Sequence, residues 1–175
     1  LIHELGAANI SGVILTVTNN SGGGQPVSMQ NAREVSKVCH ENKILFILDM
    51  CRIAENAYFI HDREKGFEGK TYKEIAQEMC SFADAAIMSA KKDGLVNMGG
   101  FLSLRNKELS DACTQLLIIT EGYSTYGGLS GRDMEAIAIG LEEVFDPAYL
   151  QYRIRSTTYL GEALYKKGVP LIYPI

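Results

Sequence analysis

The sequence predicts an α/β fold with a mostly parallel sheet flanked by helices, and three observations predict it. Short, nearly continuous apolar runs recur along the chain, as in parallel strands whose two faces are covered. Segments with apolar residues at helical spacing separate the first three of these runs. Clusters of turn-forming residues, such as residues 19–26, end the runs. Strands and helices that alternate in this order are typical of layered α/β proteins.

The first elements of this pattern lie between residues 12 and 48. The β-branched run at residues 12–18 predicts a buried strand. The turn cluster after it leads to Ser28, which can cap a helix with apolar residues at helical spacing. Residues 44–48 predict the second strand, and their unbroken apolar character predicts helices on both faces of the sheet.

The later elements are marked by caps and by further apolar runs. Thr71 with Glu74 three residues later forms a capping box, which predicts the start of a helix before the third strand. Pro147 is typical of a helix start and Gly168 of a helix end, so a long final helix is predicted between them. The remaining predicted elements are strands at residues 85–88 and 100–104 and helices at 107–119 and 133–145.

Composition and charge exclude several classes of protein. Hydrophobic residues make up 46% and charged residues 22% of the 175 residues, as in a globular domain and not in a disordered chain. The net charge of −4 gives no basic surface for nucleic acid or an anionic membrane, and no apolar run reaches the roughly 18 residues of a transmembrane helix. Four well-separated cysteines predict reduced thiols in a cytoplasmic protein, and the three histidines lack the spacing of a metal site.

Both ends of the chain lead us to expect part of a longer polypeptide. The chain opens without an initiator Met, and it closes on residues 169–175, which predict the start of a further strand. We expect residues 1–145 to form part of one large domain. Residues 146–175, with the long helix and the beginning strand, would then lead into a smaller C-terminal domain.

Polar residues follow the predicted strands, at the edge where open α/β sheets bind ligands. Asn20 comes after the first strand, and Asp49 directly follows the second. A buried carboxylate needs a donor or a cation beside it. Asp49 is therefore a helix N-cap, a salt-bridge partner of Arg52, or a carboxylate aimed at a bound cation, and the residues alone leave these alternatives open.

A lysine pair, Lys91 and Lys92, follows the third predicted strand. The charge of Lys91 favours a neutral, nucleophilic amine at Lys92, although two adjacent lysines are also typical of a solvated turn. Ser89 can contact a phosphate or simply form the turn. An acid after one strand and Ser-x-x-Lys after the next match the needs of pyridoxal phosphate (PLP): a carboxylate for its pyridinium nitrogen, an amine for its aldehyde and donors for its phosphate.

Several longer motifs lie in order along almost the whole chain: NSGGGQPVSM at residues 20–29, RIAENAYFI at 52–60, MSAKKD at 88–93, NMGG at 97–100, EG at 121–122, TYGGL at 125–129 and GRDM at 131–134. In these motifs the chain resembles the β-eliminating lyases, the family of tryptophanase and tyrosine phenol-lyase. One departure is the pair Met50-Cys51, which is bulkier than the small residues that the resemblance leads us to expect there.

The resemblance implies the aspartate aminotransferase fold of type I PLP enzymes, with residues 1–145 in its large PLP-binding domain. It also implies a cytoplasmic homotetramer activated by K⁺ or NH₄⁺. By the matching motifs, Lys92 is the Schiff-base lysine and Asp49 the partner of the pyridine nitrogen. Further implied roles are Asn20 and Arg52 near the phenolic oxygen of the cofactor, Ser89 at its phosphate, Lys91 beside it, Tyr126 as a catalytic neighbour, and the backbone carbonyl of Asn97 as a ligand of the monovalent cation.

The implied reaction is β-elimination of an aromatic amino acid: tryptophan to indole, pyruvate and ammonia, or, as the alternative, tyrosine to phenol, pyruvate and ammonia. The side chains that separate these substrates, and the loop that cradles the phosphate, lie outside the chain, so the 175 residues alone are expected to be inactive. A PLP aminotransferase and a catalytically silent α/β assembly module remain as other hypotheses. The lyase hypothesis requires Asp49 and Lys92 to converge at the strand ends.

Overall fold

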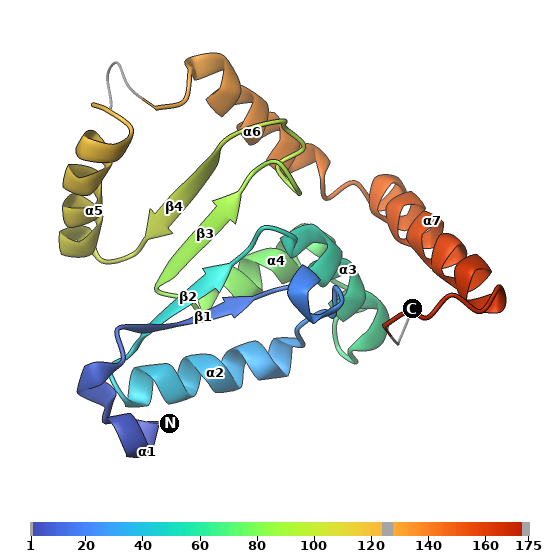
Figure 1. Ribbon diagram of the computed structural model, residues 1–175, viewed down its shortest axis with the longest axis horizontal. Helices are drawn as coiled ribbons and strands as arrows, with labels where there is room; N and C mark the ends of the chain where they lie inside the picture. The colour runs from blue at the N-terminus through green and yellow to red at the C-terminus, as the bar shows by residue number, and fades with distance from the viewer. Residues whose placement is uncertain (1, 124–127, 173–175) are drawn as a thin grey trace.

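The computed structural model describes residues 2–123 and 128–172 and has one four-stranded sheet flanked by helices (Figure 1). The strands lie side by side in sequence order. The first three pair in parallel and the fourth is antiparallel to the third. The predicted mostly parallel α/β sheet is therefore confirmed. Its strands are β1 (Gly12–Thr16), β2 (Leu45–Asp49), β3 (Ala85–Ser89) and β4 (Gly100–Leu104).

Helices precede, connect and follow the strands. None that the structure describes is long and apolar enough to cross a membrane. The strand predicted to begin at residue 169 is not found in residues 169–172, the part of that run that the structure describes. The helices are α1 (Ile2–Leu5), α2 (Met29–Glu41), α3 (Ile53–Arg63), α4 (Tyr72–Ser81), α5 (Lys107–Thr120), α6 (Gly131–Glu143) and α7 (Pro147–Lys166), with 3-10 turns η1 (Ala7–Asn9) and η2 (Asn20–Gly22).

Side-chain caps begin the helices that the sequence predicts. The Ser28 hydroxyl accepts the N–H of Asn31 at 3.1 Å at the start of α2. Thr71 and Glu74 form the predicted reciprocal capping box at the start of α4. Helix α3 is the exception, because the side chain of its N-cap residue, Arg52, makes no capping hydrogen bond. No capping signal in the sequence predicts α3.

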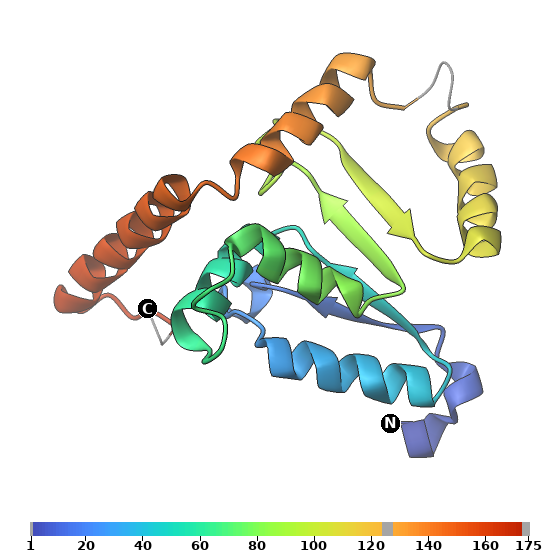
Figure 2. The same ribbon diagram turned by 180° about the vertical axis from the view of Figure 1, so that it is seen from behind.

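One face of the sheet, which we call the covered face, packs against α2, α3 and α4 (Figures 1 and 2). Side chains alternate between the two faces along a strand. Phe46 and Leu48 of β2 point to the covered face and are fully buried. Val13 and Leu15 of β1 pack against the same core. The main hydrophobic core of the described residues therefore lies on this side of the sheet.

The opposite face, which we call the open face, is apolar but poorly covered. Ile14 of β1 is 58% exposed and Leu102 of β4 is 47% exposed. Ile47 pairs with Ile14 and belongs to the same face. Within the described part of the chain, the prediction of helices on both faces is therefore wrong. Thr16 and Asp49, two residues beyond Ile14 and Ile47, end their strands on this face.

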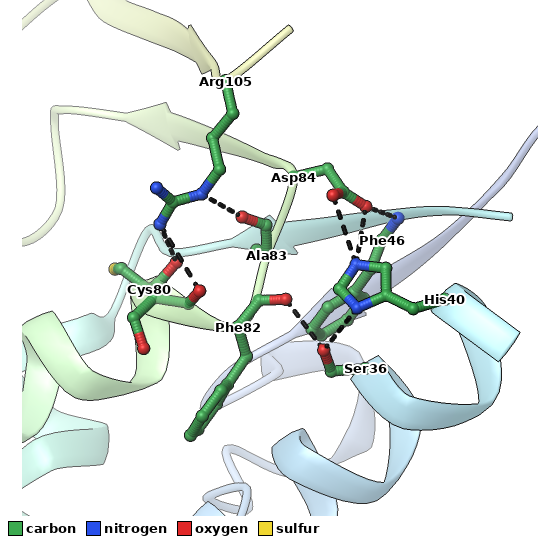
Figure 3. A network of polar contacts seen from close by, with 9 residues as sticks. Ser36, His40, Phe46, Cys80, Phe82, Ala83, Asp84 and Arg105 are labelled. Atoms are coloured by element: carbon green, nitrogen blue, oxygen red, sulfur yellow. Dashed lines mark hydrogen bonds and ion pairs between the residues drawn. The ribbon is translucent and has the colours of Figure 1, made fainter. Parts of the chain in front are cut away.

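Polar contacts fix β3 at its amino end, far from the carboxyl ends of the parallel strands (Figure 3). The carboxylate of Asp84 accepts the backbone N–H of Phe46 at 2.9 Å, and it lies 3.1 Å from Nε2 of His40. Arg105, just after β4, donates from Nε to the carbonyl oxygen of Ala83 at 2.8 Å. Helix α2, β2 and β4 are thereby all tied to the start of β3.

Candidate functional site

The predicted acid, Asp49, is the last residue of β2 and is half-buried. In the sheet it pairs with Thr16 of β1 on one side and with Ile87 of β3 on the other. Its carboxylate accepts the backbone N–H of Cys51 at 3.2 Å, and the Thr16 hydroxyl lies 3.4 Å away as a second donor. These contacts orient the Asp49 carboxylate at the carboxyl edge of the open face.

Cys51 joins the ends of β2 and β3. Its sulfur accepts the backbone N–H of Ser89 at 3.0 Å. Burial raises the pKa of the Cys51 thiol, and its hydrogen bond to Asp49 raises this pKa further, whereas the positive charge of Lys92 lowers it. The thiol is therefore protonated at neutral pH. It contacts the Asp49 carboxylate and the Ser89 backbone, and it lies within electrostatic range of Lys92.

The lysine pair lies in the turn that follows β3. Lys92 is half-buried, whereas Lys91 is exposed. The turn is attached to the segment after β2, because the backbone N–H of Asp93 donates to the carbonyl oxygen of Cys51 at 3.2 Å. The segment after β2 thus holds both the end of β3 and the turn that carries Lys92.

Asn20 and Arg52 come together beside this group. Nη1 of Arg52 lies 3.5 Å from Oδ1 of Asn20, the limit of a hydrogen bond. Both residues line a pocket of about 610 Å³ between the glycine-rich turn that contains Gly23, α3 and α7. Of the predicted site residues that the structure describes, only these two line this pocket. Asp49, Ser89 and Lys92 gather around Cys51 instead.

The structural alternatives for Asp49 are not found. Among the ion pairs of residues 2–123 and 128–172, none joins Asp49 to Arg52. Asp49 is also not the N-cap of α3, since that residue is Arg52. The carboxylate of Asp49 is therefore held by neutral donors, and the structure gives it no helix end to cap.

The roles predicted for Asn97 and Tyr126 stay predictions. Asn97 is exposed in the loop before β4, and within the described residues no three His, Cys, Asp or Glu side chains form a metal-binding group. The cation role of the Asn97 carbonyl remains a prediction. Tyr126 lies outside the described residues.

A buried acid beside the lysine pair, Asp93, also belongs to the site, although the sequence places it only after the third strand and indicates no role for it. Asp93 is completely buried, and its Oδ2 accepts the backbone N–H of Ala54 at 2.7 Å at the start of α3. Burial, and then the negative charge of Glu55, raise the pKa of Asp93 to about 7. The only signal in the sequence is an acidic residue in a turn. Its partners, 38 or more positions away, could not be inferred from spacing.

Comparison with known proteins decides the family. The profile of the beta-eliminating lyase family matches residues 1–174. A tryptophanase from Salinibacter ruber is 55% identical over 163 residues, which cover 93% of this chain and 35% of that protein. A tyrosine phenol-lyase from Fusobacterium nucleatum is 49% identical over 175 residues, which cover 100% of this chain and 38% of that protein. The chain belongs to the β-eliminating lyase family. It spans little more than a third of the length of these relatives of the family.

Solved structures support the fold of this β-eliminating lyase chain. A provisionally assigned L-allo-threonine aldolase from Listeria monocytogenes superposes with a TM-score of 0.62 over 86% of this chain and 37% of the other, at 19% identity. A methionine gamma lyase from Micromonospora echinospora superposes with a TM-score of 0.53 over 81% of this chain and 32% of the other, at 18% identity. At these identities the likeness concerns the fold alone. The predicted resemblance and fold class are confirmed.

Proposed function

We propose that the full-length polypeptide is a PLP-dependent carbon–carbon lyase that eliminates the side chain of an aromatic amino acid. One observation supports it most: Asp49 at the end of β2 is joined through Cys51 to Ser89, the last residue of β3. Lys92 lies in the turn that follows this strand. A family profile along almost the whole chain supports the reaction class. The 175 residues alone are expected to be inactive, since they span only about a third of their relatives.

The donor set fits PLP. Asp49 offers a half-buried carboxylate for the pyridinium nitrogen, Lys92 a half-buried amine for the aldehyde, and Ser89 a hydroxyl for the phosphate. Asn20 and Arg52 would lie near the phenolic oxygen. When bound, the cofactor supplies an electron sink that stabilises negative charge at the substrate Cα.

The residues of this chain would bind, orient and move protons. Thr16 and the N–H of Cys51 hold Asp49 as an acceptor, so its carboxylate can keep a ring N–H in place. Lys92 would carry the proton that leaves the substrate Cα. Lys91 would order water beside it, and Tyr126 would be a neighbour of the substrate.

Tryptophan is the substrate we propose, with tyrosine as the alternative. Tryptophanases and tyrosine phenol-lyases both occur among the relatives, at 55% and 49% identity in the two cases above. The test is an assay of the full-length protein with tryptophan and tyrosine in parallel, in which indole and phenol are measured separately. Pyruvate and ammonia that form without an added keto acid would exclude an aminotransferase. No product from either amino acid would favour the silent assembly module.

Lys92→Ala tests the role of the lysine. We expect the visible absorbance band of the bound cofactor and the lyase activity to be lost. Lys37→Ala, an exposed lysine on α2, is the matched control and should keep both. A Lys92→Ala protein with an unchanged band would remove Lys92 from this role.

The assembly and the cation belong to the same proposal. We propose a cytoplasmic homotetramer activated by K⁺ or NH₄⁺, with the backbone carbonyl of Asn97 as one ligand, since hard cations prefer oxygen ligands. We propose neither a nucleic acid nor a membrane partner. Activity that is the same in Na⁺ as in K⁺ would contradict the cation site, and sedimentation of the full-length protein would test the tetramer.

A further inference from the structure

The turn that carries Lys92 is held closely on two sides. The N–H of Asp93 donates to Cys51 on one side, as described above, and the N–H of Leu95 closes the turn on the carbonyl oxygen of Lys92 at 3.1 Å. On the other side Gly94 lies against α6, where a Cβ added to Gly140 would come within 1.9 Å of the Gly94 carbonyl oxygen. Movement of Lys92 therefore depends on what holds residues 93–95.

The Asp93 side chain fastens this turn to α3. Its carboxylate is completely buried and bonds the N–H of Ala54 in the first turn of the helix. A helix N-terminus favours negative charge, because its first N–H groups have no partner within the helix. Asp93 thus provides the cap that Arg52, the N-cap residue, does not make.

The second carboxylate oxygen of Asp93, Oδ1, lacks a hydrogen bond among the described residues, although it is buried. The guanidinium of Arg153, on α7, is 3.8 Å away, which is too far for a hydrogen bond. Arg153 is engaged elsewhere, since it pairs with Glu55 at 2.6 Å and donates to the Tyr149 hydroxyl at 3.1 Å. A buried polar atom left in this way requires an explanation.

One guanidinium therefore lies between two carboxylates, and its position sets the environment of Asp93. Burial and the negative charge of Glu55 raise the pKa of Asp93, whereas the backbone N–H groups of Ala54 and Glu55 and the charge of Arg153 lower it. A movement of Arg153 of about 1 Å toward Asp93 would turn the 3.8 Å contact into a charge-assisted hydrogen bond. Because Arg153 belongs to α7, displacement of this helix changes the bonding of the turn that carries Lys92.

We propose that Asp93 is a positioning residue that couples α7 to Lys92: the position of Arg153 decides how firmly the Lys92 turn is held on α3. This inference rests on the proposed function, because it takes Lys92 as the residue that holds the cofactor. If Asp93 only caps α3, the position of Arg153 does not change how firmly the Lys92 turn is held.

Hydrogen exchange of the full-length protein, free of cofactor, separates the two possibilities. In Arg153→Met we expect the amides of Asp93 and Leu95 to exchange about tenfold faster, because a charged partner of the buried carboxylate is lost. Arg155→Met, an exposed arginine on the same helix, is the matched control and should leave these amides unchanged. Unchanged exchange in Arg153→Met overturns the proposal.

Glu55→Gln provides a second variant in case Arg153→Met does not fold. It removes the charge that competes for Arg153, so Arg153 can move to Asp93 and the same amides should exchange more slowly than in the wild type. Equal or faster exchange in Glu55→Gln also counts against the coupling.

The bound cofactor gives the readout that a simple cap would not change. In Arg153→Met, relative to Arg155→Met, we expect about tenfold weaker binding of PLP and a displaced pH midpoint of its visible band. A faster-exchanging turn with an unchanged PLP affinity and midpoint overturns the link to Lys92. A wild-type protein that shows no cofactor band refutes the proposed function instead, and the exchange measurements still decide whether Arg153 holds the turn.

Discussion

The covered and open faces of the sheet differ both in packing and in chemistry. On the covered face, Phe46 and Leu48 are fully buried beneath three helices. On the open face, Ile14 and Leu102 remain about half exposed, although they are as apolar. The predicted cofactor ligand Asp49 belongs to the open face.

The difference shows how a sheet can keep functional groups accessible without losing its shape. The covered face supplies the hydrophobic free energy that holds the strands in place. The open face can then end in polar groups, because its side chains are not needed for the main core. Replacements of Phe46 and Ile14 test this division, and replacements of Asp93 and Gly140 test the contacts that hold the Lys92 turn beside it.

Phe46→Ala should destabilise the protein most. A fully buried aromatic side chain is removed from the centre of the covered face, so the free energy of unfolding should fall by about 3–5 kcal/mol. Denaturant unfolding of the 175-residue chain measures this. A loss below about 1 kcal/mol would show that the covered face is not the core.

Asp93→Asn tests the buried carboxyl where α3 meets the Lys92 turn. Folding raises the Asp93 pKa from 3.8 to about 7, so between these values the folded state holds a proton that the unfolded state has released. Wild-type stability should therefore fall as pH rises from about 4 to 7. The variant should lack this part of the pH dependence. Thermal unfolding of both proteins at pH 5 and pH 8 tests it, and parallel pH profiles would contradict it.

Gly140→Ala tests the contact between α6 and the Lys92 turn. A Cβ at this position would meet the Gly94 carbonyl oxygen at 1.9 Å, so backbone must move, at a cost of about 1–3 kcal/mol. Gly131→Ala, on the same helix with open space around it, should change stability by less than about 1 kcal/mol. Equal effects of the two replacements on thermal unfolding would mean that helix and turn are not in close contact.

Ile14→Ser should have the smallest effect. The side chain is already 58% exposed, so its replacement should change the unfolding free energy of the 175-residue chain by less than about 0.5 kcal/mol. A clearly larger loss in the full-length polypeptide would show that another part of it covers the open face. A large loss of unfolding free energy in the 175-residue chain itself would contradict the distinction between the two faces.

The strands could be predicted from the sequence because their signals are local. The apolar runs place β2 and β3 within one residue of their observed ends, and the Thr71–Glu74 capping box marks the start of α4. Helix α3 was not predictable in this way. Its capping carboxylate comes from Asp93, 39 residues after Ala54, so nothing next to Arg52 marks a helix start.

The candidate site was predictable as a set of residue types but not as a set of contacts. Asp49, Ser89 and Lys92 could be singled out because they follow strands. That Cys51 joins them could not, since no local pattern specifies that its sulfur accepts the N–H of Ser89. That Asn20 and Arg52 line a pocket together with residues of α7 could not be predicted either, because no local pattern brings α7 beside the glycine-rich turn.

The hydrogen bond between Asp84 and Phe46, at the amino end of β3, has an evolutionary consequence. A slip of β3 by one residue would exchange the faces of Met88 and Ser89. Because Asp84 binds the backbone of Phe46 at the far edge, this register does not depend on the connection that follows β3. Sequence changes after β3 therefore need not turn Ser89 to the other face, whereas Gly94 and Leu95 stay constrained because they hold the Lys92 turn.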